Sequence, residues 1–141
     1  MTSITEFMQG DHRACDETFS KTEESVASGD WVSAKESWDS FRNELYSHID
    51  EKEEKILFPA FEEVNGPAGP TVIMRGEHQQ MRALVSEIDK ALENRDTARF
   101  LGLGEQLMIT IQQHNMKEEQ ILYPLMDRRI ANVSELVGQL S

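Results

Sequence analysis

Apolar side chains recur along most of this chain at intervals of three and four residues, which is the period of an α-helix. The alternating pattern expected of β-strands is scarcely seen. The pattern predicts four long helices, each with one apolar stripe, and a short amphipathic C-terminal helix at 132–140. The four stripes are Met8, His12, Cys15 and Phe19; Ala34, Trp38, Phe41, Leu45 and His48; Met74, His78, Met81, Val85, Ile88 and Leu92; and Phe100, Leu103, Leu107, His114, Glu118, Ile121 and Leu125.

Capping and breaking residues mark the ends of these helices. Ser3 is a candidate N-cap, with Glu6 three residues later to complete a capping box, and Asp30 is a candidate N-cap for the second helix. The breaker at 65–70 separates two helical hairpins. Four amphipathic helices with short connections predict an all-α fold, an antiparallel up-down-up-down four-helix bundle, with residues 1–141 as a single domain.

Composition narrows the range of partners and locations. The chain has 26 acidic against 14 basic residues and a formal net charge of -12, which argues against nucleic acid or an anionic membrane as partner. The single cysteine, Cys15, excludes an internal disulfide and Cys-rich metal sites, and it favours a reducing compartment. No targeting segment or membrane-spanning run is apparent, so we expect a cytoplasmic protein.

The four histidines lie one on each predicted stripe, at repeated intervals. His12 and His48 are 36 residues apart, as are His78 and His114, and each histidine of the second pair follows its counterpart by 66 residues. These intervals predict a duplicated helical hairpin. Two hairpins packed about a pseudo-twofold axis would bring the four imidazoles to similar depth in the core.

A second repeat accompanies the histidines. Glu-Glu-Lys-Ile-Leu-Phe-Pro at 53–59 recurs as Glu-Glu-Gln-Ile-Leu-Tyr-Pro at 118–124. Glu118 follows His114 by four residues, so both side chains lie on one helix face. A buried carboxylate needs a compensating charge, and a metal ion supplies one. Mixed nitrogen and oxygen ligation favours iron, zinc or manganese over calcium or magnesium.

The first hairpin departs from this spacing. Lys52 stands four residues after His48, and Glu53 follows at five. Because the apolar stripe slips by one residue at the same point, we predict a π-bulge between His48 and Glu53 that turns Glu53 back toward a metal. Glu51, three residues after His48, is the competing candidate ligand.

The combined arrangement resembles the hemerythrin-like, or HHE, cation-binding domain over nearly the whole chain. It comprises a lone histidine in the first and third helices, a histidine with Glu-Glu and Leu-Phe-Pro in the second, and His-x-x-x-Glu-Glu with Leu-Tyr-Pro in the fourth. The resemblance implies a non-haem di-iron centre whose two iron ions are bridged by two carboxylates and an oxo or hydroxo group. Carried over to this chain, the terminal ligands would be His12, His48, His78 and His114, and the bridging ligands Glu53 and Glu118.

One departure from the family pattern bears on function. Oxygen-carrying hemerythrins have a fifth histidine, usually from a His-x-x-x-His pair in the third helix, whereas Met74 and Arg82 stand four residues either side of His78. With about five ligands each, the irons would keep an exchangeable position for a small ligand. We therefore expect binding or sensing of oxygen, nitric oxide or peroxide rather than stable oxygen storage. No protein partner can be named from the sequence.

Other functions stay open at this point. The same centre in an enzyme would support peroxidase-like or oxidase-like chemistry or repair of damaged iron centres, whereas iron buffering or a structural zinc ion would make the metal a cement for the core. A ferritin-like site is disfavoured because the residues three before the histidines are not acidic. The His-Glu-x-x-His spacing of zinc proteases is absent. Histidines paired with acids in a metal-free core are the remaining structural interpretation.

Three residues beside the candidate ligands have both a structural and a functional interpretation. Cys15, one turn beyond His12, is a packing residue, a residue that faces the metal pocket or a redox-sensitive thiol. Glu54 and Glu119 directly follow the candidate bridging glutamates. We expect them to support the ligands or to face solvent.

Overall fold

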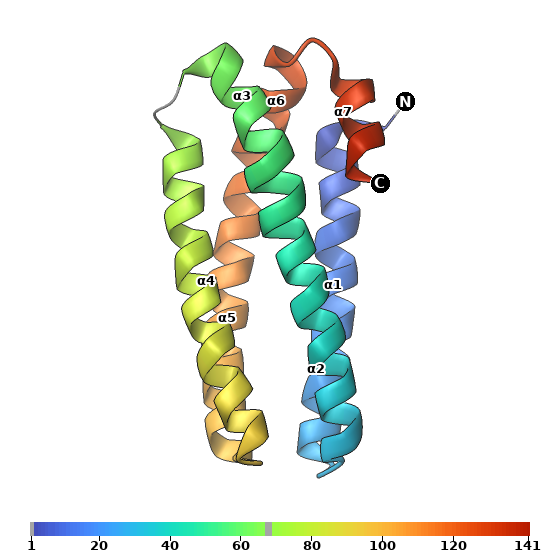
Figure 1. The fold of residues 1–141 in the computed structure, drawn as a ribbon, viewed down its shortest axis with the longest axis vertical. Helices are drawn as coiled ribbons and strands as arrows, with labels where there is room; N and C mark the ends of the chain where they lie inside the picture. The colour runs from blue at the N-terminus through green and yellow to red at the C-terminus, as the bar shows by residue number, and fades with distance from the viewer. Residues whose placement is uncertain (1, 67–68) are drawn as a thin grey trace.

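The computed structural model describes residues 2–66 and 69–141, and within them it contains helices and no strand. Two antiparallel hairpins form an up-down-up-down four-helix bundle (Figure 1). The first hairpin joins α1 (Ile4–Ala27) to a continuous rod of α2 (Trp31–Tyr46), the π-helix η1 (Ser47–Leu57) and α3 (Phe58–Asn65). The second joins α4 (Pro70–Glu93) to a rod of α5 (Thr97–Lys117), the π-helix η2 (Glu118–Leu122) and α6 (Tyr123–Arg129). The fold class predicted from the sequence is confirmed.

Capping residues end the helices where the sequence predicts. The Ser3 side chain accepts a hydrogen bond from the Glu6 N–H at 3.0 Å, and Asp30 accepts one from the Ser33 N–H at 3.1 Å. Both predicted N-caps are confirmed. The predicted breaker at 65–70 falls between α3 and α4, and its residues 67–68 lie outside the described part of the chain.

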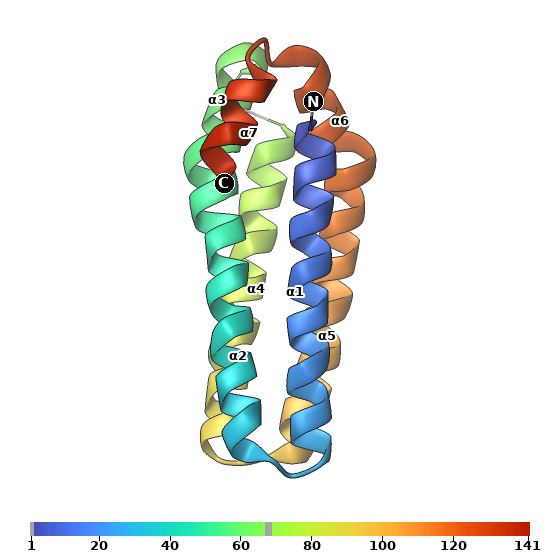
Figure 2. The same ribbon diagram turned by 90° about the vertical axis from the view of Figure 1, so that its right-hand side faces the viewer.

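The C-terminal segments close one end of the bundle. The short helix α7 (Val133–Leu140) packs against η1 and α1, near the start of α1 (Figure 2). Asp127 of α6 accepts hydrogen bonds from the backbone N–H groups of Ile4 and Thr5, at 2.8 and 3.2 Å. These bonds satisfy donors that the first turn of any helix leaves unpaired. They tie the last helix of the second hairpin to the first helix of the chain.

The bundle core consists of two apolar clusters with a polar layer between them. The lower cluster, on the side of the α1–α2 connection at the bottom of Figure 1, includes Phe19, Trp38 and Phe41. The upper cluster, on the side of α7, includes Phe58 and Tyr123. The buried polar side chains of the layer come from all four long rods of the bundle: His12, His48, Glu53, His78, His114 and Glu118. The sequence stripes thus meet in one core, but the core changes character at its middle.

One predicted stripe position is wrong. Ile121, placed on the fourth stripe by its spacing, is 62% exposed, while Leu122 and Met126 are buried. The cause is the π-helical turn η2, which was not predicted. A π-turn takes up one more residue than an α-turn, so the inward face moves on by one position after it.

Two further expectations concern Cys15 and the location of the protein. Cys15 is buried, and burial raises the pKa of its thiol to about 12, which keeps the thiol protonated and favours the packing interpretation.

Among the described residues, no helix combines the length and apolar character needed to cross a membrane. The cytoplasmic location stays a prediction.

Candidate metal centre

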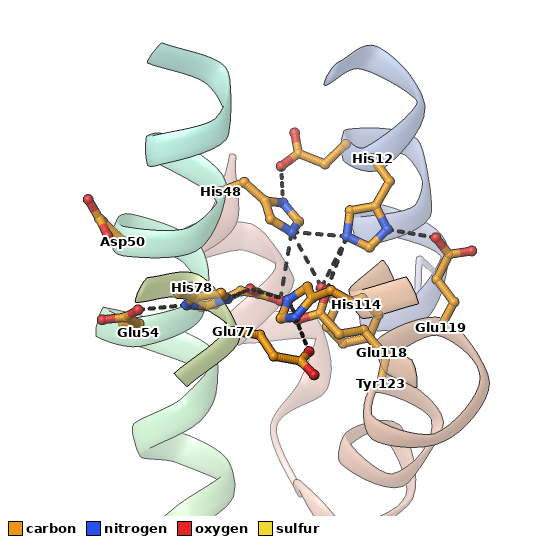
Figure 3. Close-up of polar contacts among 12 residues, drawn as sticks. His12, His48, Asp50, Glu54, Glu77, His78, His114, Glu118, Glu119 and Tyr123 are labelled. Atoms are coloured by element: carbon orange, nitrogen blue, oxygen red, sulfur yellow. Dashed lines mark hydrogen bonds and ion pairs between the residues drawn. The ribbon is translucent and has the colours of Figure 1, made fainter. Parts of the chain in front are cut away.

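Four imidazole rings converge in the polar layer, one from each of the main rods (Figure 3). They come from His12 on α1, His48 on η1, His78 on α4 and His114 on α5, and none is more than 5% exposed. The Nε2 atoms of His12 and His48 lie 3.0 Å apart. The rings of His78 and His114 also face each other, with centroids 4.9 Å apart. The predicted juxtaposition of the histidines is therefore present as two pairs.

Glu118 connects the two histidine pairs. Its Oε1 lies 3.3 Å from Nε2 of His12, and its Oε2 lies 3.1 Å from Nε2 of His114. The carboxylate is fully buried. One oxygen therefore faces each pair, which is the arrangement that a bridging carboxylate needs.

Glu53 makes a similar connection from the other rod. Its Oε1 lies 2.8 Å from Nε2 of His78 and 3.9 Å from Nε2 of His114, while its Oε2 lies 3.7 Å from Nε2 of His48. This carboxylate is also fully buried. The two glutamates thus face both histidine pairs.

The donor atoms fall into two groups, each close enough to hold one cation. Within each group the atoms lie within 4.8 Å of one another. The first group, called the His12–His48 position, consists of His12, His48 and Glu118; the second, called the His78–His114 position, consists of Glu53, His78, His114 and Glu118. All six residues predicted from the sequence as ligands are brought together, and Glu118 belongs to both groups.

The π-helix η1 is what brings Glu53 into the centre. In an α-helix Glu53 would lie about 140° around the axis from His48. The predicted π-bulge is confirmed, since η1 spans Ser47–Leu57, and the wider turn moves Glu53 inward. Glu51, the competing candidate, lies on the surface with its side chain 58% exposed and paired with Lys55 at 2.8 Å.

A shared proline explains why both halves contain π-helix at this level. The backbone N–H of Phe58 bonds to the carbonyl of Glu53, and that of Tyr123 bonds to the carbonyl of Glu118, five residues back in each case. The next residue is a proline in both halves. Its ring would clash with the carbonyl four residues back in an α-helix, and a wider turn relieves that clash. The second proline was therefore a sequence signal for η2.

Each candidate ligand histidine contacts a carboxylate through its outward-facing Nδ1 atom. The Nδ1–oxygen distances are 2.6 Å for His12 with Glu119, 2.6 Å for His48 with Asp11, 2.6 Å for His78 with Glu54 and 2.7 Å for His114 with Glu77. Because each Nδ1–H donates to a carboxylate, the lone pair of each Nε2 is free to bind a cation. This support also fixes how each ring is turned.

Sequence reasoning anticipated only half of these supports. Glu54 and Glu119 were candidates, whereas Asp11 and Glu77 were missed, although they precede histidines of the repeat and are 66 residues apart as those histidines are. Each missed carboxylate also binds a lysine, Lys52 at 2.8 Å in the first hairpin and Lys117 in the second. The repeated acid and lysine were the available signal.

The buried glutamates of the polar layer need a compensating positive charge. Burial would raise the pKa of Glu53, but the neighbouring histidines, His48 foremost, hold it well below its ordinary value. Burial would lower the pKa of His114, but Glu118 and Glu53 raise it to about 11. Without a metal, protons therefore balance the buried carboxylates.

Orphaned polar atoms test whether a metal fits. Among the described residues, Nε2 of His114 and both carboxylate oxygens of Glu118 are buried without any hydrogen-bond partner. Such atoms are costly unless something binds them. All three are donor atoms of the two groups described above, so the residues present fit a pair of cations.

Tyr123 is a residue of the centre that sequence reasoning missed. Its buried hydroxyl donates a hydrogen bond to Oε2 of Glu53 and lies 3.4 and 3.5 Å from Nε2 of His12 and His48. Burial and the charges of the two buried glutamates raise the pKa of this phenol well above its ordinary value. The sequence shows Tyr123 only as one more apolar residue of the repeat, where Phe58 has no hydroxyl.

A small cavity adjoins the centre on the side of the lower cluster. Its volume is about 10 Å³, close to what one water-sized molecule needs. The cavity is lined by three of the candidate ligand histidines, His12, His48 and His114, and by Cys15, Leu45, Ile49, Met81, Ile111 and Asn115. Cys15 thus faces the cavity beside the candidate centre. The cavity is therefore small, mostly apolar and lined in part by candidate ligand histidines.

Comparison with known proteins identifies the family. The hemerythrin HHE cation-binding domain matches residues 3–126 of the 141. No match was found among curated proteins or among solved structures. The family match covers every candidate ligand, and the buried histidines and glutamates are arranged to hold metal cations. This chain belongs to the hemerythrin HHE cation-binding domain family.

Proposed function

We propose that this protein holds two iron ions and uses them to bind or sense a small ligand such as oxygen, nitric oxide or peroxide. Mixed imidazole and carboxylate donors suit iron, and paired metals held by carboxylates inside helical bundles are typical of di-iron proteins. Bound iron would supply an exchangeable coordination position. The terminal ligands would be His12, His48, His78 and His114, and the bridging ligands Glu53 and Glu118.

The cavity beside the histidines carries this proposal. Its volume of about 10 Å³ leaves room for a ligand of very few atoms and excludes organic substrates of ordinary size. The walls from Leu45, Ile49 and Met81 favour an uncharged guest. Asn115 adds one amide that a bound ligand can meet. A fifth histidine, which would fill a coordination position, is absent from the sequence.

The test begins with protein purified without air and with its native metals. We expect two iron ions per chain, by metal analysis and Mössbauer spectroscopy. Separate additions of oxygen, nitric oxide and peroxide should give an absorption band that disappears when the ligand is removed. The matched pair Glu118→Gln and Glu119→Gln controls the result, because the first residue faces both histidine pairs and the second only supports His12 from outside.

Two outcomes would replace this function with the alternatives raised by the sequence. Catalytic consumption of peroxide, many equivalents per protein, would make the protein an enzyme rather than a sensor. Native zinc, together with an iron-loaded form that shows no ligand-dependent band, would reduce the metal to a structural role. Both outcomes are measured on the same preparation, so one series of samples decides among a sensor, an enzyme and a structural metal site.

A further inference from the structure

The two candidate metal positions differ in one polar group. Tyr123 begins α6 directly after η2, and Phe58 holds the equivalent place directly after η1. The ring of Phe58 stacks on His78 with centroids 5.6 Å apart and an interplanar angle of 12°. Tyr123 instead brings a buried hydroxyl to His12 and His48. The pseudo-twofold repeat is therefore broken at the centre itself.

The hydroxyl lies at the spacing of a neighbouring metal ligand. Nitrogen and oxygen donors that share a cation at ~2.1 Å lie roughly 3.0 to 3.4 Å apart when the angle at the cation is between a right angle and a tetrahedral one. His12 Nε2 and His48 Nε2 are 3.0 Å apart, and Tyr123 Oη is 3.4 and 3.5 Å from them. Two of the three distances fall within this range and the third lies just above it, so the three atoms are spaced closely enough to surround one ion.

The number of donor residues at each position also favours a role for the Tyr123 hydroxyl in metal binding. Four residues form the His78–His114 position, whereas three form the His12–His48 position, where Oε2 of Glu53 stands back at 3.7 Å from His48. The Tyr123 hydroxyl lies beside this smaller set and is fully buried. A further donor is thus available where the protein supplies fewest.

We propose that Tyr123 is a metal ligand, binding through Oη at the His12–His48 position and making the two metal positions chemically unequal. The inference rests on the proposed function in requiring a cation in the centre. On binding, the phenol O–H bond breaks, the proton passes to Oε2 of Glu53, which already accepts its hydrogen bond, and is released from there to bulk water, and a lone pair of the phenolate oxygen forms the bond to the cation. No oxidation state changes. Tyr123 then exchanges its hydrogen bond to Glu53 for a shared role at the same ion.

Tyrosine ligation leaves the ligand cavity untouched. Tyr123 belongs to the upper cluster, with Phe58 and Leu57, while the cavity is walled by lower-cluster residues such as Leu45 and Ile111. Tyr123 does not line that cavity. The phenol and a small guest would therefore approach the His12–His48 pair from different sides.

The chain contains its own controls for this proposal. It has two tyrosines, and the other, Tyr46, is a partly buried residue of α2 that packs against the lower cluster. Tyr46→Phe therefore removes a tyrosine without changing the centre. Tyr123→Phe gives the second half the residue that the first half already has at Phe58, so it is a mild change for packing. Circular dichroism and thermal melting establish that each variant is folded.

Two spectroscopic readouts test the proposal without any assay of activity. Titration of the metal-free protein with gallium(III) should produce the ultraviolet difference spectrum of one tyrosinate per chain in the wild type and in Tyr46→Phe, and none in Tyr123→Phe. In the ferric protein, we expect a visible charge-transfer band with resonance-enhanced tyrosinate ring vibrations, again lost only in Tyr123→Phe. Phe58→Tyr should leave the wild-type signal in place.

The possible failures are distinguishable. Cations bound in the expected number with no tyrosinate signal in the wild type would overturn the Tyr123 proposal and leave the metal centre standing. A signal that disappears in Tyr46→Phe, or persists in Tyr123→Phe, would overturn it as well. Failure to bind any cation would overturn the metal centre and the tyrosine ligand together.

Discussion

Nδ1 of His48 lies 2.6 Å from Oδ2 of Asp11, and His114 repeats this contact with Glu77 at 2.7 Å. Both pairs are separated by 37 residues in the chain, and both join the two arms of one hairpin. The duplication therefore reproduces the outer support of the histidines as well as their inward nitrogen atoms. The candidate ligands and the hydrogen bonds that orient them form one repeated unit.

Loss of this support should weaken metal binding without unfolding the protein. Asp11→Asn and Glu77→Gln remove the charge that holds His48 and His114, and we expect a 10- to 100-fold lower metal affinity, typical of such outer partners. Chelator competition with zinc or ferrous iron measures the change. Asp16→Asn is the matched control, because its carboxylate bonds to Gln112 at the surface. Equal affinity in all three variants would contradict the role given to these carboxylates.

Removal of an inward ligand should abolish the stabilisation that metal provides. A ligand at 100 times its dissociation constant stabilises the folded state by about 2.7 kcal/mol per site. We expect metal to raise the melting temperature of the wild type and to leave His114→Ala and Glu118→Ala nearly unchanged, with less metal retained after dialysis. Full metal content in either variant would show that the residue is not a ligand.

Glu53 and Glu51 offer a direct comparison within one rod. Glu53→Gln should lower metal content because its carboxylate is fully buried against His78 at 2.8 Å. Glu51→Gln should leave metal content unchanged because that side chain pairs with Lys55 on the surface. Metal analysis after identical purification compares the two. The reverse ranking would assign the bridge to Glu51.

Part of this centre could be predicted from the sequence because it depends on the helical period of the apolar residues and on the number of residues between histidines. The histidine intervals and the slipped stripe before Glu53 are one-dimensional patterns, and they predicted which six residues would meet in the core and the π-helical turn of η1. The turn η2 was missed because His114 and Glu118 have ordinary helical spacing. Its effect, the outward turn of Ile121, comes after Glu118 in the chain, where no further histidine marks the change of the inward face.

Residues that act across helices were beyond these patterns. Asp11 lies next to His12 in the chain but supports His48, so its role depends on how α1 packs against η1. Tyr123 occupies a core position that any large apolar residue fits, and only the packed bundle shows where its hydroxyl lies. Sequence spacing identifies neighbours on one helix, whereas these contacts join separate helices.

The cavity makes a prediction about ligand release. Asn115 occupies the place in the second half that Ile49 occupies in the first, and both line the cavity. Asn115→Ile would remove the one amide near a guest. Since a neutral hydrogen bond contributes about 0.5–1.5 kcal/mol, we expect bound oxygen or nitric oxide to dissociate about two- to tenfold faster. Stopped-flow absorption measures the rate, and an unchanged rate would exclude a hydrogen bond from Asn115.

Damage to the lower cluster should affect stability and leave the metal centre intact. Phe41 is fully buried against Phe19 and Trp38, with ring centroids 5.1 and 5.4 Å away. Phe41→Ala should reduce the free energy of unfolding by about 3–5 kcal/mol. Chemical denaturation gives this value, and the folded variant should retain the wild-type metal content. Loss of metal from folded Phe41→Ala would show that the two regions are coupled.

The polar layer between the two apolar clusters has a mechanical consequence. Each end of the bundle is stabilised by its own apolar cluster, whereas the stability of the middle depends on the positive charge that neutralises Glu53 and Glu118. When the cations are removed, the polar layer becomes the least stable part of the bundle, and both π-helices lie at that level. The supply of cations would then govern the stiffness of the middle of the bundle, while its two ends keep their apolar packing.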